Sequence, residues 1–203
     1  MNNENERETM SLTRRLTTFA ILTALVIVLQ LWGSSIRIGI VSLNFVLIPI
    51  VLCGMLLGVL YGALIGLVVG FVTLICGITG FDSFTMILLG ESPVLITAIC
   101  LIKTTAAGAV SALIYKAMKN RHKYVGTFLS AAATPLVNTS IFILGMLCIL
   151  DILKKNFIND GTSAIYFLFV NIVGLNFIFE FILNLLLAPA LFRVIEVIGK
   201  SRR

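Results

Sequence analysis

Long apolar runs separated by short polar segments dominate the sequence. No charged residue occurs from Leu43 to Thr79. A single helix over that run would be ~55 Å long, whereas the hydrocarbon core of a bilayer is ~30 Å thick. The run must therefore fold back on itself, and the Gly58–Gly62 region is the predicted turn. The whole pattern predicts six membrane-spanning helices, at about residues 16–32, 43–57, 60–79, 92–116, 124–150 and 163–188.

The segments around these spans are more polar. Residues 1–13 are predicted to form a disordered cytoplasmic tail, and residues 80–91 and 151–162 are predicted loops. Pro189 is expected to end or kink the sixth helix, because proline lacks the backbone N–H of a helix interior. The alternating apolar and basic residues after it predict an interfacial C-terminal segment. Residues 14–203 are therefore interpreted as one membrane domain.

Composition supports membrane residence. Hydrophobic residues make up 59% of the 203 residues and charged residues 12%, whereas soluble domains average ~45–50% and ~25%. These values exclude a water-soluble enzyme, a disordered chain and a coiled coil. The net charge of +6 comes from residues in tails and loops, so it indicates contact with lipid headgroups of the bilayer and not with nucleic acid.

The distribution of charge predicts the orientation. Cytoplasmic loops of membrane proteins carry an excess of Lys and Arg. With six spans and both termini in the cytoplasm, the inner segments hold Arg14, Arg15, Lys116, Lys119, Arg121, Lys123, Arg193, Lys200, Arg202 and Arg203. The alternation fails with five or seven spans. The predicted fold class is all-α: a polytopic membrane protein with cytoplasmic N- and C-termini.

Three consecutive spans each place a polar side chain at a similar depth. Lys103, Asn138 and Asn176 all lie ~17–20 Å from the outer ends of their predicted helices. Polar groups at that depth are costly and usually functional, so they predict the floor of an outward-open pocket, with Asn171 nearer the outside. In the alternative, Lys103 pairs with Glu180 and the asparagines bond across helices only for packing.

Residues beside the outer loops are candidates for the pocket rim. Trp32, Arg37 and Asn44 flank the first outer loop, and Phe84 and Glu91 lie in the second. We therefore predict that these five residues contribute to substrate binding. The alternative for the aromatic side chains is an interfacial anchor, which is their common role near span ends.

The sequence lacks the motifs of an enzyme. It contains no GxxxxGK[ST], GxSxG or HExxH, and the four cysteines lie inside apolar runs without ligand spacing. No catalysis, cofactor or metal is therefore expected. Five glycines spaced four residues apart, from Gly54 to Gly70, predict close helix packing, and Ala20 and Ala24 offer a small-residue face to a neighbouring helix or a partner subunit.

Several short motifs occur together in a fixed order. They are Ala20-xxx-Ala24 after Arg14-Arg15, Leu56-Leu57-Gly58 followed by Tyr61-Gly62-Ala63-Leu64-Ile65-Gly66, and Gly90-Glu91-Ser92-Pro93. With its size and its six predicted spans, the chain resembles the substrate-binding S components of energy-coupling factor (ECF) vitamin transporters over about residues 14–195.

The resemblance implies that Ala20 and Ala24 contact a transmembrane scaffold subunit joined to two cytosolic ATPases, in the plasma membrane of a bacterium. It also implies a vitamin site near the outer face, within the last three helices. Pantothenate is favoured, because the pantothenate-type members are most similar to the run Pro135-Leu136-Val137-Asn138-Thr139-Ser140-Ile141-Phe142.

Other substrates and two other classes of function stay open. Folate, riboflavin or a pyridoxine or pyrimidine precursor could replace pantothenate in the same role. A stand-alone secondary transporter could couple to ions through Glu180 and Lys103. A membrane scaffold without transport activity could use the glycine faces to gather partners.

Overall fold

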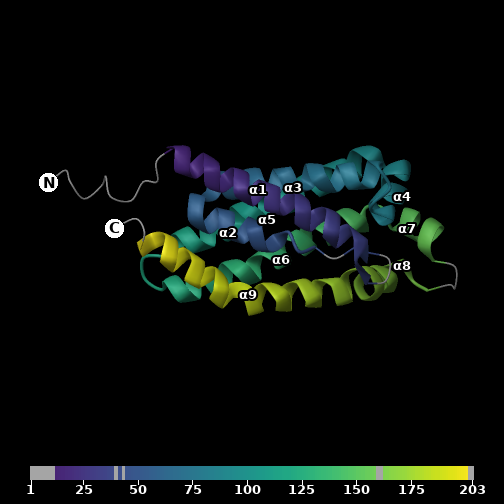
Figure 1. Ribbon diagram of the computed structural model, residues 1–203. Coiled ribbons are helices and arrows are strands. Elements are labelled where there is room, and N and C mark those ends of the chain that lie inside the picture. Colours follow the sequence, from purple (N-terminus) through teal and green to yellow (C-terminus); the bar gives the residue numbers. More distant parts are fainter. Residues whose placement is uncertain (1–11, 39–40, 43, 159–161, 201–203) are drawn as a thin grey trace.

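The computed structural model describes residues 12–38, 41–42, 44–158 and 162–200, and this part of the chain is a bundle of helices (Figure 1). The elements, in order, are α1 (Leu12–Ser35), β1 (Arg37–Ile38), β2 (Val41–Ser42), α2 (Leu47–Leu57), α3 (Val59–Ile78), α4 (Ser83–Glu91), α5 (Pro93–Met118), α6 (Lys123–Leu147), α7 (Leu150–Phe157), α8 (Ala164–Tyr166), the π-helix η1 (Phe167–Gly174) and α9 (Leu175–Lys200). The two-residue strands form one antiparallel pair. The prediction of an all-α polytopic membrane protein is confirmed.

Among the described residues, five helical segments are long and apolar enough to cross a bilayer: α1, α3, α5, α6 and the continuous segment Ala164–Ile198, which joins α8, η1 and α9. The second predicted span is shorter than expected. Helix α2 has 11 residues and reaches ~16 Å, about half the hydrocarbon core. Pro49 lies in its first turn, where a missing N–H is tolerated, so the described residues just before α2 are not helical.

Two segments predicted as loops contain helices. Gly80, with φ of 81°, reverses the chain before α4, and α7 follows α6 almost directly. Both short helices bury apolar side chains, among them Leu88 at 2% exposure and Leu153 at 0%. The loop predictions were wrong because short helices also form where a few side chains, such as Phe84 and Leu88 of α4 and Leu153 of α7, pack on the bundle.

The first and last described helices also differ from the predicted boundaries. Leu12 and Thr13 belong to α1, although the predicted tail included them, and residues 1–11 lie outside the described part. Helix α9 continues through Pro189 to Lys200, so the helix does not end there. Figure 1 shows the last turns of α9 inclined to the rest, which matches the alternative prediction of a kink.

The described chain begins and ends at the same end of the bundle. Helix α1 begins and α9 ends on the same side, whereas α4, α7 and α8 lie at the opposite end (Figure 1). This arrangement agrees with an even number of crossings. We refer to the end with α4 and α7 as the outer end, following the predicted orientation.

Helices α3 and α5 approach so closely that only glycine fits at their contact. A Cβ atom placed on Gly108 would lie 2.0 Å from the Gly62 carbonyl oxygen, and one on Gly66 would lie 2.2 Å from the Thr104 carbonyl oxygen. Because neighbouring heavy atoms need more than 3 Å, these glycines allow backbone contact between the helices. Packing within the chain is therefore their role. Gly58, with φ of 98°, makes the turn from α2 to α3.

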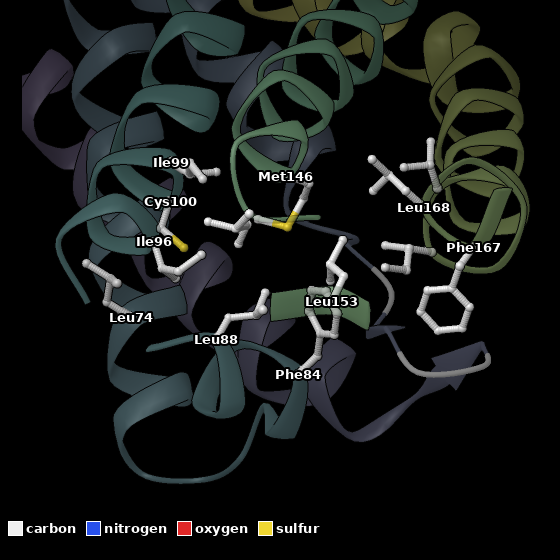
Figure 2. Close-up of a cluster of buried hydrophobic side chains, with 13 residues drawn as sticks. Leu74, Phe84, Leu88, Ile96, Ile99, Cys100, Met146, Leu153, Phe167 and Leu168 are labelled. Carbon is white, nitrogen blue, oxygen red and sulfur yellow. The ribbon is translucent and has the colours of Figure 1, made fainter. Parts of the chain in front are cut away.

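The outer end is closed by a cluster of buried apolar side chains, which we call the outer cluster. It joins α4 and α7 to α3, α5, α6 and η1, through residues that include Phe84, Leu88, Met146, Leu153 and Phe167. Figure 2 shows the side chains of α4 and α7 pointing into the space between α5 and η1. Two further clusters pack α1 on α2 and α3, and α2 on α5, α6 and α9.

Candidate functional site

A small polar pocket lies between α5, α6, the η1–α9 segment and the residues just before α2. Its volume is about 40 Å³, and it is lined by Asn44, Lys103, Asn138, Thr139, Phe142, Ile172, Val173, Asn176, Phe177 and Glu180. A cavity of this size has room for a few water molecules. The sequence predicted the floor of an outward-open pocket at this level and gave no volume for it.

Helical spacing brings the polar groups to this pocket. Asn176 and Glu180 are four residues apart on α9, and Asn138 and Phe142 are four residues apart on α6. Residues with that spacing share one helix face. Helix α5 runs beside α6, so Lys103 reaches the same level as Asn138. Ile172 and Val173 belong both to the pocket lining and to the outer cluster, which therefore lies against the outer side of the pocket.

The charged groups of the pocket have neutral neighbours. The Asn44 side-chain amide donates a hydrogen bond to Glu180 Oε1 at 3.0 Å. Lys103 Nζ lies 5.0 Å from the centroid of the Phe142 ring, within the range of a cation–π contact. The two ion pairs found among the described residues are at the ends of the bundle, so the predicted alternative of a Lys103–Glu180 ion pair is not formed.

Two amide oxygens of the pocket accept no hydrogen bond within the described structure: Asn138 Oδ1 and Asn176 Oδ1. The Asn138 side chain is 4% exposed and that of Asn176 is 6% exposed. The Asn176 amide nitrogen donates to the Ile172 carbonyl oxygen at 3.0 Å. An unpartnered buried acceptor costs ~1–3 kcal/mol. Both oxygens can therefore accept donors from a molecule in the pocket.

The structure brings together four of the predicted site residues: Lys103, Asn138, Asn176 and Asn44. Asn171, by contrast, is exposed on η1. Trp32 is 56% exposed, and its ring lies 5.2 Å from that of Phe45. Neither Asn171 nor Trp32 lines the pocket.

Phe84 and Glu91 also lie outside the pocket, because the segment that holds them is a helix and not a loop. Phe84 is 4% exposed within the outer cluster. Glu91 accepts a hydrogen bond from Lys155 Nζ at 2.8 Å, joining α4 to α7. This bond holds the pKa of Glu91 below its ordinary value of 4.5. The side chain of Arg37 lies outside the described part of the structure.

Several lining residues were not predicted as part of the site. Phe142 and Glu180 could have been found from the four-residue spacing that links them to Asn138 and Asn176. Ile172 and Val173 could not, because they lie in the π-helix η1, where the wider turn changes which side chains face inward. Short π-helical segments are often found near functional sites.

A larger hollow of about 480 Å³ lies near the opposite end of the bundle, between α6 and α9. It is an open surface feature next to the Arg193–Glu196 ion pair. It contains none of the predicted pocket residues. Within the described residues, no cluster of three His, Cys, Asp or Glu side chains could hold a metal ion.

The fold and the pocket together define a small polytopic membrane protein with a pocket between α5, α6 and the η1–α9 segment that is lined by polar and apolar side chains. The family model of the ECF transporter, substrate-specific component, matches residues 14–192, and the chain belongs to that family. The family is a transporter component and not an enzyme family. Searches of curated proteins and of solved structures found no match.

Proposed function

We propose that this protein is the high-affinity vitamin-binding subunit of an ECF importer in a bacterial plasma membrane. It captures the vitamin outside the cell and releases it inside when coupled to a transmembrane scaffold subunit and two cytosolic ATPases. One observation carries the proposal. The buried oxygens of Asn138 and Asn176 have no donor among the described residues, and they line the same pocket as the ammonium group of Lys103.

Pantothenate is the favoured substrate. Its carboxylate would accept charge-assisted hydrogen bonds from Lys103, which are stronger than neutral ones. Its two hydroxyls and its amide N–H would supply donors to the asparagine oxygens. Folate, riboflavin and a pyridoxine or pyrimidine precursor are the alternative substrates for the same role.

The pocket must widen to hold any vitamin. Sites for small molecules usually have volumes of ~300–1,000 Å³, compared with about 40 Å³ here. Binding therefore requires side chains and helices around the pocket to separate. The outer cluster lies against the pocket, so its packing must change in this step.

Helix α1 is the proposed contact with the scaffold subunit. Ala20 and Ala24 are exposed on the surface of α1 and lie on one face. Small residues with this spacing allow another helix to approach closely in lipid. Their exposure supports a contact with a partner and not with another helix of this chain.

Purification and ligand analysis test the proposal. The protein in detergent should retain a vitamin that mass spectrometry identifies, and after removal of that ligand it should bind one equivalent in calorimetry. Asn138→Leu should abolish binding, whereas Asn171→Leu, at an exposed asparagine, should not. Failure to bind any of the candidate vitamins at sub-micromolar concentration, or equal effects of the two variants, would contradict it.

The stand-alone secondary transporter is the second candidate, because Lys103 and Glu180 both line the pocket. Reconstitution in liposomes distinguishes the two. Uptake by the lone protein under a proton or sodium gradient would favour this candidate. Uptake that requires the scaffold and the ATPases would favour the ECF importer.

A further inference from the structure

The pocket contains one cationic and one acidic side chain that do not pair with each other. Glu180 is 4% exposed, and Lys103 is half-buried on the neighbouring side of the pocket. Opposite charges brought into a membrane protein normally form an ion pair, because each is costly alone. Here the ammonium group of Lys103 lies over the Phe142 ring. The Glu180 carboxyl group instead bonds with Asn44.

Asn44 satisfies only part of the hydrogen-bonding capacity of Glu180. A carboxylate has about four acceptor positions on its two oxygens. The Asn44 side chain donates to Oε1 at 3.0 Å, and the Asn44 backbone N–H also donates to the Glu180 carboxyl group. No side chain of another described residue is found to donate to Glu180. The remaining acceptor positions are therefore available to a molecule in the pocket.

Three side chains bring hydrogen-bond acceptors to the pocket. The oxygens of Asn138 and Asn176 have no donor among the described residues, and the Glu180 carboxyl group has acceptor positions beyond those that Asn44 uses. Lys103 provides the single cationic group among the lining residues. A molecule that complements these groups needs one acidic group and several O–H or N–H donors.

We propose that Glu180 is a specificity-determining residue that accepts the donor groups of the substrate, while Lys103 binds its acidic group. The substrate is then a small organic acid that carries hydroxyl or amide donors. The inference rests on the proposed function and narrows it. It excludes acids without such donors, such as nicotinate, and vitamins without an acidic group, such as pyridoxine and riboflavin.

Three related ligands distinguish the proposed role of Lys103 from that of Glu180. Pantothenate carries the acid and the donors. Panthenol has an alcohol in place of the carboxylate, and an analogue with both hydroxyls replaced by hydrogen keeps the acid. The wild-type protein should bind pantothenate more tightly than either compound, by about 10- to 150-fold. Binding is measured by calorimetry, with displacement for the weaker ligands.

Two variants then test the assignment. Glu180→Gln should weaken the binding of pantothenate by about tenfold or more, because the Gln NH2 group replaces an acceptor oxygen and faces the hydroxyl donors of the ligand. The affinity for the analogue without hydroxyls should stay unchanged. Lys103→Met should weaken pantothenate and leave panthenol unchanged. Glu196→Gln on α9 and Lys154→Met on α7 are the matched controls, since neither residue lines the pocket.

Some results would contradict the role of Glu180, and others would contradict the proposed function. Glu180→Gln protein that melts like the wild type and binds pantothenate equally well overturns the inference. Equal losses for pantothenate and the hydroxyl-deleted analogue also overturn it, since Glu180 would then only position the helices. Preference of the wild type for pyridoxine, riboflavin or nicotinate overturns the inference but keeps vitamin binding. Failure to bind pantothenate, folate or any of these compounds overturns the proposed function itself.

Discussion

An ammonium group near the middle of a membrane bundle needs a partner or a purpose, because charged groups are costly at that depth. Lys103 Nζ lies over the face of the Phe142 ring, and within the described structure it forms no ion pair. The ring stabilises the charge and leaves the three N–H donors of the ammonium group available. This arrangement suits a residue that exchanges its partner when a ligand arrives.

Lys103→Met is expected to weaken an anionic ligand by ~1.5–3 kcal/mol, which is the contribution of a hydrogen bond to a charged group. The unbranched Met side chain keeps the packing against Phe142, so the melting temperature should stay close to that of the wild type. Calorimetry measures the affinity, with Lys154→Met as the control on the exposed side of α7. Unchanged affinity would remove Lys103 from the site.

At the scale of single residues, the sequence singled out three polar side chains by their position within apolar runs. Lys103, Asn138 and Asn176 stand out because each is polar within an apolar run, and the structure brings all three to one pocket. Glu91 could not be assigned in this way. Its hydrogen-bonding partner, Lys155, is 64 residues later in the chain, and no local pattern links the two.

At the scale of the elements, the backbones of α3 and α5 lie so close together that a side chain does not fit at their glycines. The Gly62 carbonyl oxygen occupies the position that a side chain on Gly108 would need. That oxygen belongs to the backbone, so it cannot move without displacing α3. The site depends on this contact, because α5 also carries Lys103.

Gly108→Ala should therefore destabilise the protein by ~1–3 kcal/mol, the usual effect of overpacking. Gly90→Ala is the control, since no atom lies within 4 Å of a Cβ placed there. The melting temperature in detergent should fall for Gly108→Ala and stay unchanged or rise slightly for Gly90→Ala. Equal melting temperatures for the two variants would contradict the close contact.

The Glu91–Lys155 bond makes the contact between α4 and α7 sensitive to acid. Its hydrogen bond lowers the pKa of Glu91 from 4.5 in the folded protein. The stabilisation is thus present above pH 4.5 and is lost as the pH falls through the lower folded-state pKa. The melting temperature should differ between wild type and Glu91→Gln at neutral pH, and this difference should vanish in acid.

Salt and a second variant provide the controls for this prediction. The pair is exposed, so high ionic strength should also reduce the difference between wild type and Glu91→Gln. Asp151→Asn removes a different acidic group from α7 and should not reproduce the pH dependence. A difference that persists at low pH would mean that the Gln side chain acts through packing and not through charge.

For the whole molecule, the exposed face of α1 is the proposed contact with another protein. Helix α1 packs on α2 and α3 through Leu22 and Val26, while Ala20 and Ala24 remain exposed. A lipid-facing helix does not require small residues, because lipid chains adapt to any side-chain size. The proposed scaffold subunit gives these alanines a function.

Replacing both Ala20 and Ala24 with Trp should leave ligand binding intact and abolish uptake by the complete transporter, because the scaffold could no longer approach closely. The control is Trp at Ile182 and Leu186, which are exposed on α9 at the same spacing. Calorimetry measures binding, and uptake is measured in liposomes with scaffold and ATPases. Loss of binding in the alanine variant would indicate an internal packing role instead.

The sequence by itself determined the membrane class, the all-helical fold and which polar residues interrupt the apolar helices, because hydrophobicity and helical spacing are properties of contiguous residues. Only the tertiary structure decided that α4 and α7 close the outer end, that Phe84 lies in the core, and that Lys103 and Glu180 share a pocket without pairing. These features depend on contacts between segments far apart in the chain, and such contacts leave no periodic pattern in the sequence.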